Sequence, residues 1–286
     1  MSDQFQIYCC ARSRVDKGRL QTDLSRSPEI ENGNVGLTIL WDQPNAAGAY
    51  ARAMKEATAE VLIFAHCDVY FPNGWFERLA WEADRLSQMD PNWAVAGISS
   101  ITASGEQVGR MFDTALEPVF RQTSGVFGKE LAAPVRIVSA DELVLVVRRG
   151  AGISFDPLLP EFHLYGTDII LEAERQGKSS YGLDMPLIHN AKAQLRLGRD
   201  YERAFRYMIR KWRDRLPVPT TCIPLTTAPF TLAIARTRLR YMATFKRSTY
   251  SIQRISDPGA KAAELGFEKL LAAPLVRAEH LFPEMS

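Results

Sequence analysis

The sequence predicts an α/β fold in which a mixed, mostly parallel sheet is flanked by helices, with a helical extension at the C-terminal end. Three apolar stretches rich in β-branched and aromatic residues are separated by segments with helical spacing of apolar residues. This alternation is typical of right-handed β–α–β crossovers. The chain of 286 residues is 46% hydrophobic and 24% charged, which suits a globular protein with one large core.

In the first third of the chain, strands and helices alternate regularly. Pro28 is expected to end the first helix, and Asn45 is expected to cap the second at its N-terminus. The expected elements are strand 5–11, helix 16–28, strand 35–41, helix 45–59, strand 60–68, helix 74–89 and strand 93–101.

The middle of the chain is less regular. Thr167 is the expected cap of a helix that Gly177 stops, and Pro217 follows the last helix of this part. The expected elements are a hairpin arm at 105–113, one or two strands within 134–150, a proline-bearing loop at 155–166, helix 167–177, a short strand within 179–190 and helix 200–216.

Composition limits the classes of partner and compartment. A net charge of +2 and a pI near 8.3 are too weakly basic for a protein that grips a nucleic-acid backbone. The four cysteines show no CxxC spacing, so we interpret them as reduced thiols of a cytoplasmic protein. The N-terminus lacks a signal-peptide pattern, and no apolar stretch approaches the ~20 residues of a spanning helix.

The composition changes near residue 222, which predicts two parts, 1–221 and 222–286. The second part is helical and basic, and Arg236 to Arg247 carry its densest positive charge. We expect this stretch to contact either an anionic membrane surface, such as the inner face of the membrane, or a partner chain.

Four polar residues occupy similar positions in the predicted sheet. His66 and Asp68 end the third strand, Asp168 opens a helix, and His189 ends a later strand. Ligands of open α/β sheets bind at the carboxyl ends of the strands. Imidazole and carboxylate groups there suit Mn²⁺ or Mg²⁺ with a diphosphate. The alternative is that all four residues are structural. Asp68 then stabilises the turn, Asp168 interacts favourably with the dipole at a helix N-terminus, and His66 and His189 are hydrogen-bonded histidines of the core.

Two blocks of sequence resemble the family-two glycosyltransferases of GT-A fold. The first is NAAGAYARAMKEATAEVLIFAHCDVYFPNGWFERL (45–79), with an Asn- and Ala-rich helix before a strand that ends in an Asp-x-Asp-like motif. It is most similar to a bacterial glycosyltransferase-like subgroup with a His-x-Asp-Val-Tyr version. The second is FDPLLPEFHLYGTDIILEAERQGKSSYGLDMPLIHN (155–190), in which an acidic residue opens a helix and a histidine follows the next strand. The resemblance spans about residues 5–217.

The resemblance implies roles for individual residues. Asp68 matches the metal-ligating second Asp of the motif, and His66 replaces the first, which contacts ribose or metal. His189 matches a histidine that completes the metal coordination, and Asp168 matches the catalytic base of inverting members. Arg12 and Asp42 are the further candidates for contacts to the nucleotide sugar, which are implied at the ends of the first two strands.

The implied function is the transfer of a sugar from a UDP- or GDP-linked donor to a saccharide or lipid-linked hydroxyl acceptor, with inversion and with Mn²⁺ or Mg²⁺. Since His66 removes one hard oxygen ligand, the alternative is a degenerate, non-catalytic protein that binds sugar nucleotides or serves as a scaffold. Another metal-assisted phosphate enzyme would need a denser cluster of Asp and His than this sequence offers.

Overall fold

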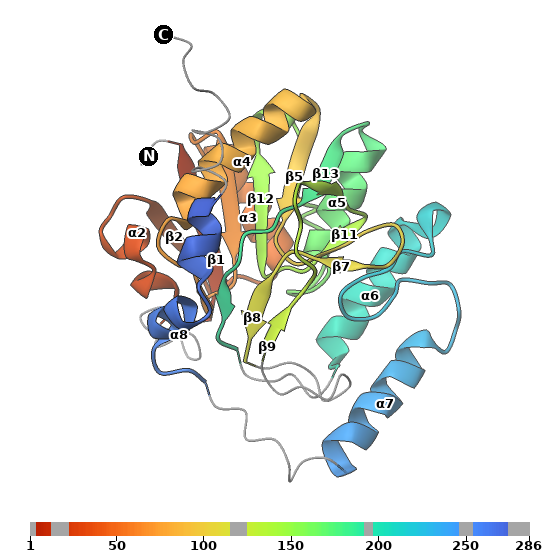
Figure 1. Ribbon diagram of the computed structural model, residues 1–286. Coiled ribbons are helices and arrows are strands. Elements are labelled where there is room, and N and C mark those ends of the chain that lie inside the picture. Colours follow the sequence, from red (N-terminus) through yellow and green to blue (C-terminus); the bar gives the residue numbers. More distant parts are fainter. Residues whose placement is uncertain (1–3, 13–22, 115–124, 192–196, 246–253, 274–286) are drawn as a thin grey trace.

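The structure is a computed structural model that describes residues 4–12, 23–114, 125–191, 197–245 and 254–273, without the side chains of 242–245. It confirms the α/β class (Figure 1). The strands are β1 (Phe5–Ala11), β2 (Gly36–Trp41), β3 (Val61–Ala65), β4 (Val69–Tyr70), β5 (Trp93–Gly97), β6 (Ser100–Ile101), β7 (Gln107–Val108), β8 (Met111–Asp113), β9 (Gly125–Phe127), β10 (Val135–Arg136), β11 (Ser139–Ala140), β12 (Val144–Arg148), β13 (Ser179–Gly182) and β14 (Ile188–His189). The α-helices are α2 (Pro28–Glu31), α3 (Ala46–Glu56), α4 (Trp75–Met89), α5 (Tyr165–Arg175), α6 (Arg199–Lys211), α7 (Thr231–Phe245) and α8 (Pro258–Glu264).

The central sheet has seven strands in the order β10-β13-β5-β12-β3-β1-β2. Strands β1, β2, β3, β5 and β13 run in one direction, while β10 and β12 run in the other. The mixed, mostly parallel sheet is therefore confirmed. A smaller sheet, β4-β14-β8-β9, continues from the carboxyl end of β3, and the junction of these two sheets holds the candidate site.

Side chains of the central strands alternate between two buried clusters. Tyr8, Leu62 and Phe64 face one side of the sheet, while Ile7 and Ile63 face the other. The first side is covered by α3, α5 and α6, and the second is covered by α4. Both faces are thus buried, as expected for strands whose sequences are almost continuously apolar.

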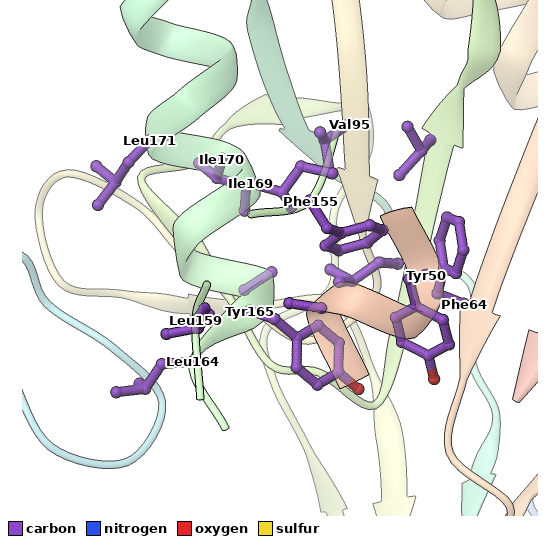
Figure 2. Close-up of a cluster of buried hydrophobic side chains, with 14 of the residues drawn as sticks. Tyr50, Phe64, Val95, Phe155, Leu159, Leu164, Tyr165, Ile169, Ile170 and Leu171 are labelled. Atoms are coloured by element: carbon purple, nitrogen blue, oxygen red, sulfur yellow. The ribbon is translucent and has the colours of Figure 1, made fainter. Parts of the chain in front are cut away.

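An aromatic cluster fixes the loop before α5 against β3 (Figure 2). The ring centroids of Tyr50 and Phe64 lie 4.7 Å apart, and those of Phe64 and Phe155 lie 4.8 Å apart. Tyr165 adds an edge contact to Tyr50 at 5.5 Å. These tilted and edge-on contacts are the favoured geometries of buried rings, and they anchor the N-terminus of α5 beside the carboxyl end of β3.

Two caps are settled by the structure. The side chain of Asn45 accepts a hydrogen bond from the N–H of Gly48 at 2.6 Å, which confirms the cap of α3. The expected cap Thr167 is wrong, because α5 already begins at Tyr165. The N-cap position is Leu164, which has a positive φ of 65° and makes no side-chain cap hydrogen bond.

Other expectations at element ends also need correction. Pro28 begins α2 rather than ending a helix, because the first helical residue needs no N–H donor; residues 13–22 lie outside the described residues. The stretch 134–150 contains three strands, and 179–190 contains two, β13 and β14, which belong to different sheets. The helix expected over 200–216 ends at Lys211, and a 3₁₀ turn follows it.

Residues 254–273 return to the body of the protein and pack on the smaller sheet. Ala262 and Phe267 are buried against Tyr70, Phe112 and Ile188. Farther along, Leu271 joins the core beneath α4. The division into 1–221 and 222–286 stays a prediction, but at least one segment of the second part is built into the same hydrophobic core as the first.

Candidate functional site

The turn after β3 and the strand β14 bring three ligand-type side chains together. His66 and Asp68 lie in the turn, where the N–H of His66 donates to the carbonyl of Leu143 at 3.0 Å. Antiparallel pairing of β14 with β4 sets His189 opposite Val69, next to Asp68. One ligand atom from each of His66, Asp68 and His189 lies within 4.8 Å of the others. The structure thus assembles three of the four polar residues that the sequence placed at the sheet edge.

His189 is held by a carboxylate that the sequence analysis missed. Parallel pairing of β14 with β8 sets His189 beside Asp113. The Nδ1 atom of His189 lies 2.9 Å from Oδ2 of Asp113, and its Nε2 atom lies 3.5 Å from Oδ1 of Asp68. A carboxylate on one ring nitrogen orients the imidazole and leaves the other nitrogen for a metal.

The protonation states of the two histidines differ. Burial lowers the pKa of His66, although the charge of Asp68 opposes this effect. Burial also acts to lower the pKa of His189, but the hydrogen bonds to Asp113 and Asp68 outweigh it and raise this pKa well above its ordinary value. His66 is therefore neutral and ready to coordinate, whereas coordination by His189 requires release of a proton.

The donor set fits a divalent transition metal. Two imidazoles and one carboxylate suit Mn²⁺ better than Mg²⁺, which prefers oxygen ligands and keeps much of its water. The buried Asp113 supplies the support that metal-ligating histidines ordinarily have. His66, Asp68 and His189 could hold the ion, with coordination positions left for other ligands.

A pocket of about 130 Å³ is formed near this group, lined in part by Glu142, His163, Thr167 and Tyr201. Its Asp141 and His163 lie close enough to affect the pKa of His66. Burial and the charge of Asp141 raise the pKa of Glu142 to about 8. A carboxyl group with such a pKa can accept or donate a proton near neutral pH, so Glu142 is a second functional candidate.

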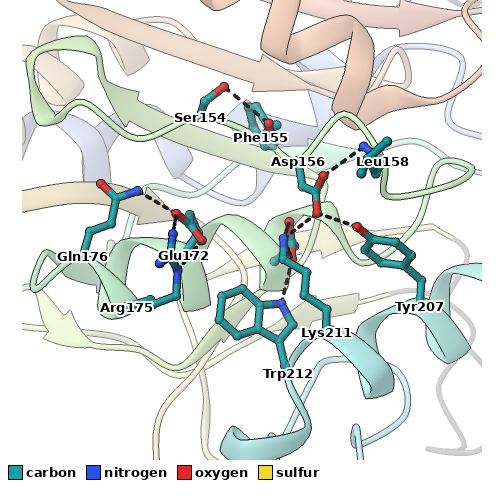
Figure 3. Close-up of polar contacts among 11 residues, drawn as sticks. Ser154, Phe155, Asp156, Leu158, Glu172, Arg175, Gln176, Tyr207, Lys211 and Trp212 are labelled. Atoms are coloured by element: carbon teal, nitrogen blue, oxygen red, sulfur yellow. Dashed lines mark hydrogen bonds and ion pairs between the residues drawn. The ribbon is translucent and has the colours of Figure 1, made fainter.

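Asp168 points to a different set of partners. It lies in the first turn of α5 with its side chain only 2% exposed, and it accepts hydrogen bonds from Lys211 Nζ and Trp212 Nε1, both at 2.7 Å. Lys211 also bonds Asp156 at 2.7 Å, as Figure 3 shows. Burial raises the pKa of Asp168 despite these partners. Thr167, not Asp168, lines the pocket.

Arg12 and Asp42 follow the carboxyl ends of β1 and β2, at the sheet edge where β3 also ends. The guanidinium of Arg12 stacks over the ring of Phe162 at 5.2 Å. Asp42 has a positive φ of 50° and donates its N–H to the carbonyl of Ala11 at 2.8 Å. Their contacts to a nucleotide stay a prediction.

No family model matches the sequence. A curated relative from Fuscovulum blasticum, "ATP synthase subunits region ORF 6", is 28% identical over 171 residues, which cover 59% of this chain and 66% of the relative, just under two thirds of its length.

Similar solved structures include GalNAc-T7 with UDP, GalNAc and Mn²⁺, at a TM-score of 0.45 and 11% identity over 87% of this chain and 58% of that one. They also include the mannosyltransferase PcManGT from Pyrobaculum calidifontis with GDP-Man and Mn²⁺, at 0.43 and 12% over 97% and 80%. S. aureus TarS 1–349 with UDP-GlcNAc is similar at 0.45 and 13% over 86% and 74%. These TM-scores lie below 0.5, so neither the site nor the function is inferred from them.

Proposed function

We propose that this protein transfers a sugar from a nucleotide-diphosphate donor to a hydroxyl acceptor, with inversion and with Mn²⁺. The observation that carries the proposal is the grouping of His66, Asp68 and His189, supported by Asp113, at the carboxyl end of β3. The two sequence blocks of glycosyltransferase type contain all three candidate ligands. The group of His66, Asp68 and His189 would also fit other metal enzymes. Sugar transfer is proposed among them because the two sequence blocks resemble those of glycosyltransferases.

The resemblance carried by the two sequence blocks gives the chain's own residues their proposed roles. Arg12 and Asp42, at the ends of β1 and β2, are the proposed contacts to the nucleotide, and Asp168 is the proposed acceptor of the hydroxyl proton. Mn²⁺, when bound, neutralises charge that develops on the diphosphate as the leaving group departs. One carboxylate base on the opposite side of the sugar suffices for inversion, because no second carboxylate is needed to protonate a diphosphate.

The donor site is tested by calorimetric titration of UDP, GDP and their sugar conjugates, with and without Mn²⁺. We expect one nucleotide to bind only with Mn²⁺. Loss of a residue that only supports a metal ligand through a hydrogen bond lowers metal affinity roughly 10–100-fold. Asp68→Ala removes a proposed ligand itself, so it should weaken nucleotide binding by more than this. Asp214→Ala, which removes a carboxylate remote from the turn after β3, is the control. Binding of no nucleotide by the folded wild-type protein would overturn the proposal.

A second candidate, a non-catalytic protein that binds sugar nucleotides, is favoured by one observation. The proposed base Asp168 is occupied by Lys211 and Trp212, at 2.7 Å each. Mn²⁺-dependent donor binding without transfer to any acceptor and without hydrolysis of the donor would support this alternative.

The acceptor is proposed to be lipid-linked and reached at an anionic membrane surface through α7. Among the described residues, no helix is long and apolar enough to cross a bilayer. Leu239 on α7 is buried, while Phe230, Ile234 and Tyr241 are 61–70% exposed. At about 100° per residue, Ile234 and Tyr241 lie roughly 20° apart on α7, on the side opposite Leu239, and Phe230 directly precedes the helix.

The exposed stripe of α7 is bordered by arginines, and the helix carries no acidic residue. Arg238 and Arg240 are exposed and project to either side of the stripe. Aromatic and aliphatic side chains between arginines suit the interface of a bilayer with anionic lipids. The basic residues 246 and 247, which the sequence analysis included in this surface, lie outside the described residues.

Binding to vesicles tests this surface. The wild-type protein should sediment with vesicles that contain phosphatidylglycerol and remain free of pure phosphatidylcholine vesicles. Arg238→Glu should weaken this binding about tenfold or more, because each basic residue near the surface contributes about 1 kcal/mol. Lys55→Glu on α3 makes the same change of charge elsewhere and should bind as the wild type does. Equal binding by both variants would remove α7 from the membrane surface.

A further inference from the structure

Asn190, the residue after His189, connects the candidate metal site to a segment far along the chain. Its backbone N–H donates to the carbonyl of Asp68 at 2.8 Å, and its own carbonyl accepts from Arg254 Nε at 2.9 Å. Asn190 is only 1% exposed. One buried residue therefore touches a proposed metal ligand on one side and residue 254 on the other.

The side chain of Asn190 is also fully engaged. Its Oδ1 atom accepts from the N–H of Ile255 at 2.8 Å, while its Nδ2 donates to the carbonyl of Ile255 at 2.9 Å and to Asp23 Oδ1 at 3.0 Å. Arg254 completes the network through an ion pair with Asp23. Such a fully bonded buried network holds its members in one arrangement.

The same segment covers the strands that carry His189 and Asp113. Ala262 and Phe267 pack against Tyr70 of β4, Phe112 of β8 and Ile188 of β14. Phe112 and Ile188 directly precede Asp113 and His189 in the sequence, and Tyr70 lies two positions after Asp68. The segment thus supports β4, β8 and β14 from one face, while its Arg254 and Ile255 hold the end of β14.

We infer that residues 254–271 are a structural part of the metal site and that Arg254 is a positioning residue, which acts through Asn190 to fix Asp68 and His189. This inference rests on the proposed metal site of the glycosyltransferase. Loss of the contact would leave all three ligands in the chain but lower the affinity for Mn²⁺.

A matched pair of arginines makes the test selective. Arg254 forms an ion pair with Asp23 in the body of the protein and donates a hydrogen bond to the carbonyl of Asn190. Arg26 also ties the body to this segment, through the carbonyl of Ser256 at 3.0 Å and Asp257 at 3.8 Å. Arg26→Met therefore removes a tie of the same kind that does not involve Asn190.

The measurement is Mn²⁺ affinity by calorimetry and by electron paramagnetic resonance, with thermal unfolding of each variant alongside. We expect both Arg254→Met and Arg26→Met to lower the unfolding temperature, but only Arg254→Met to weaken Mn²⁺ binding, by about 10-fold or more. Should Arg254→Met not fold, Arg254→Lys carries the same comparison, because it keeps the charge opposite Asp23 and loses the Nε donor to Asn190.

The outcomes separate this inference from the proposed function. Wild-type affinity for Mn²⁺ in Arg254→Met, or equal weakening in both variants, would overturn the positioning role alone. A folded wild-type protein that binds no Mn²⁺ would instead overturn the metal site itself, and the positioning role with it.

Discussion

Asp168→Asn should lower the rate of sugar transfer by about 100- to 10,000-fold, the usual contribution of a general base, while donor affinity stays close to that of the wild type. The amide keeps the shape of the side chain but cannot take the proton of the acceptor hydroxyl. Transfer is measured with the nucleotide sugar that the titration identifies, and donor affinity is measured by calorimetry.

The control for this prediction is Asp156→Asn. Asp156 contacts the same Lys211 Nζ at 2.7 Å (Figure 3), so its replacement disturbs the lysine without removing the proposed base. We expect only a modest change in its transfer rate. Wild-type turnover in Asp168→Asn would move the base role elsewhere, and Glu142, which lines the pocket, would then be the carboxylate to replace.

The carboxylate of Asp168 must be freed from its present hydrogen bonds before it can act as a base. Lys211 and Trp212 occupy its Oδ1 atom, and the side chain is almost fully buried. An acceptor hydroxyl can reach the carboxylate only if α6 or the Lys211 side chain shifts. The same contacts would also serve a purely structural ion pair, so activity measurements need a stability measurement beside them.

The fold was predictable where local pattern and burial agree. The apolar runs of β1, β2 and β3 and the capped α3 follow from periodicity and side-chain chemistry within a few residues. Strand β12 inserts antiparallel between β3 and β5, across long sequence separations. Its apolar sequence marks it as buried but contains no information on direction, which depends on packing of the whole sheet.

Of the candidate site, only the three candidate metal ligands could be predicted from the sequence. His66 and Asp68 share one turn, and His189 follows an apolar run, so each carried a local signal. Asp113 ends a stretch that we expected to be a hairpin arm, and it gains meaning only from its pairing with His189. The only sequence signal for Asp113 was that a carboxylate follows an apolar strand pattern. Arg254 acts through contacts that no spacing in the sequence reveals.

Lys211→Met should destabilise the protein by about 3 kcal/mol at pH 8, the range found when one partner of a buried ion pair is removed. Lys211 lies between Asp156 and Asp168, and its side chain is 24% exposed. Its loss leaves the buried Asp168 carboxylate without its cation. Denaturant unfolding at fixed pH measures the change in free energy.

The pH dependence of this variant has a definite sign. Burial already raises the pKa of Asp168, and the nearby Lys211 charge is the main influence that lowers it. Without Lys211 this pKa rises further in the folded state, so the folded variant keeps a proton that the unfolded chain releases above about pH 4. Stability of Lys211→Met therefore falls as pH rises through this window, and its deficit should be smaller at pH 5 than at pH 8.

The double variant Asp168→Asn/Lys211→Met separates the structural role from the catalytic one. Because both charges are gone, it should regain part of the stability that Lys211→Met loses. If Asp168 is the base, the double variant is folded, binds the donor and does not transfer sugar. If the pair is structural only, the double variant transfers sugar at nearly the wild-type rate, and the occupied carboxylate of Asp168 has no role beyond joining α5 to α6.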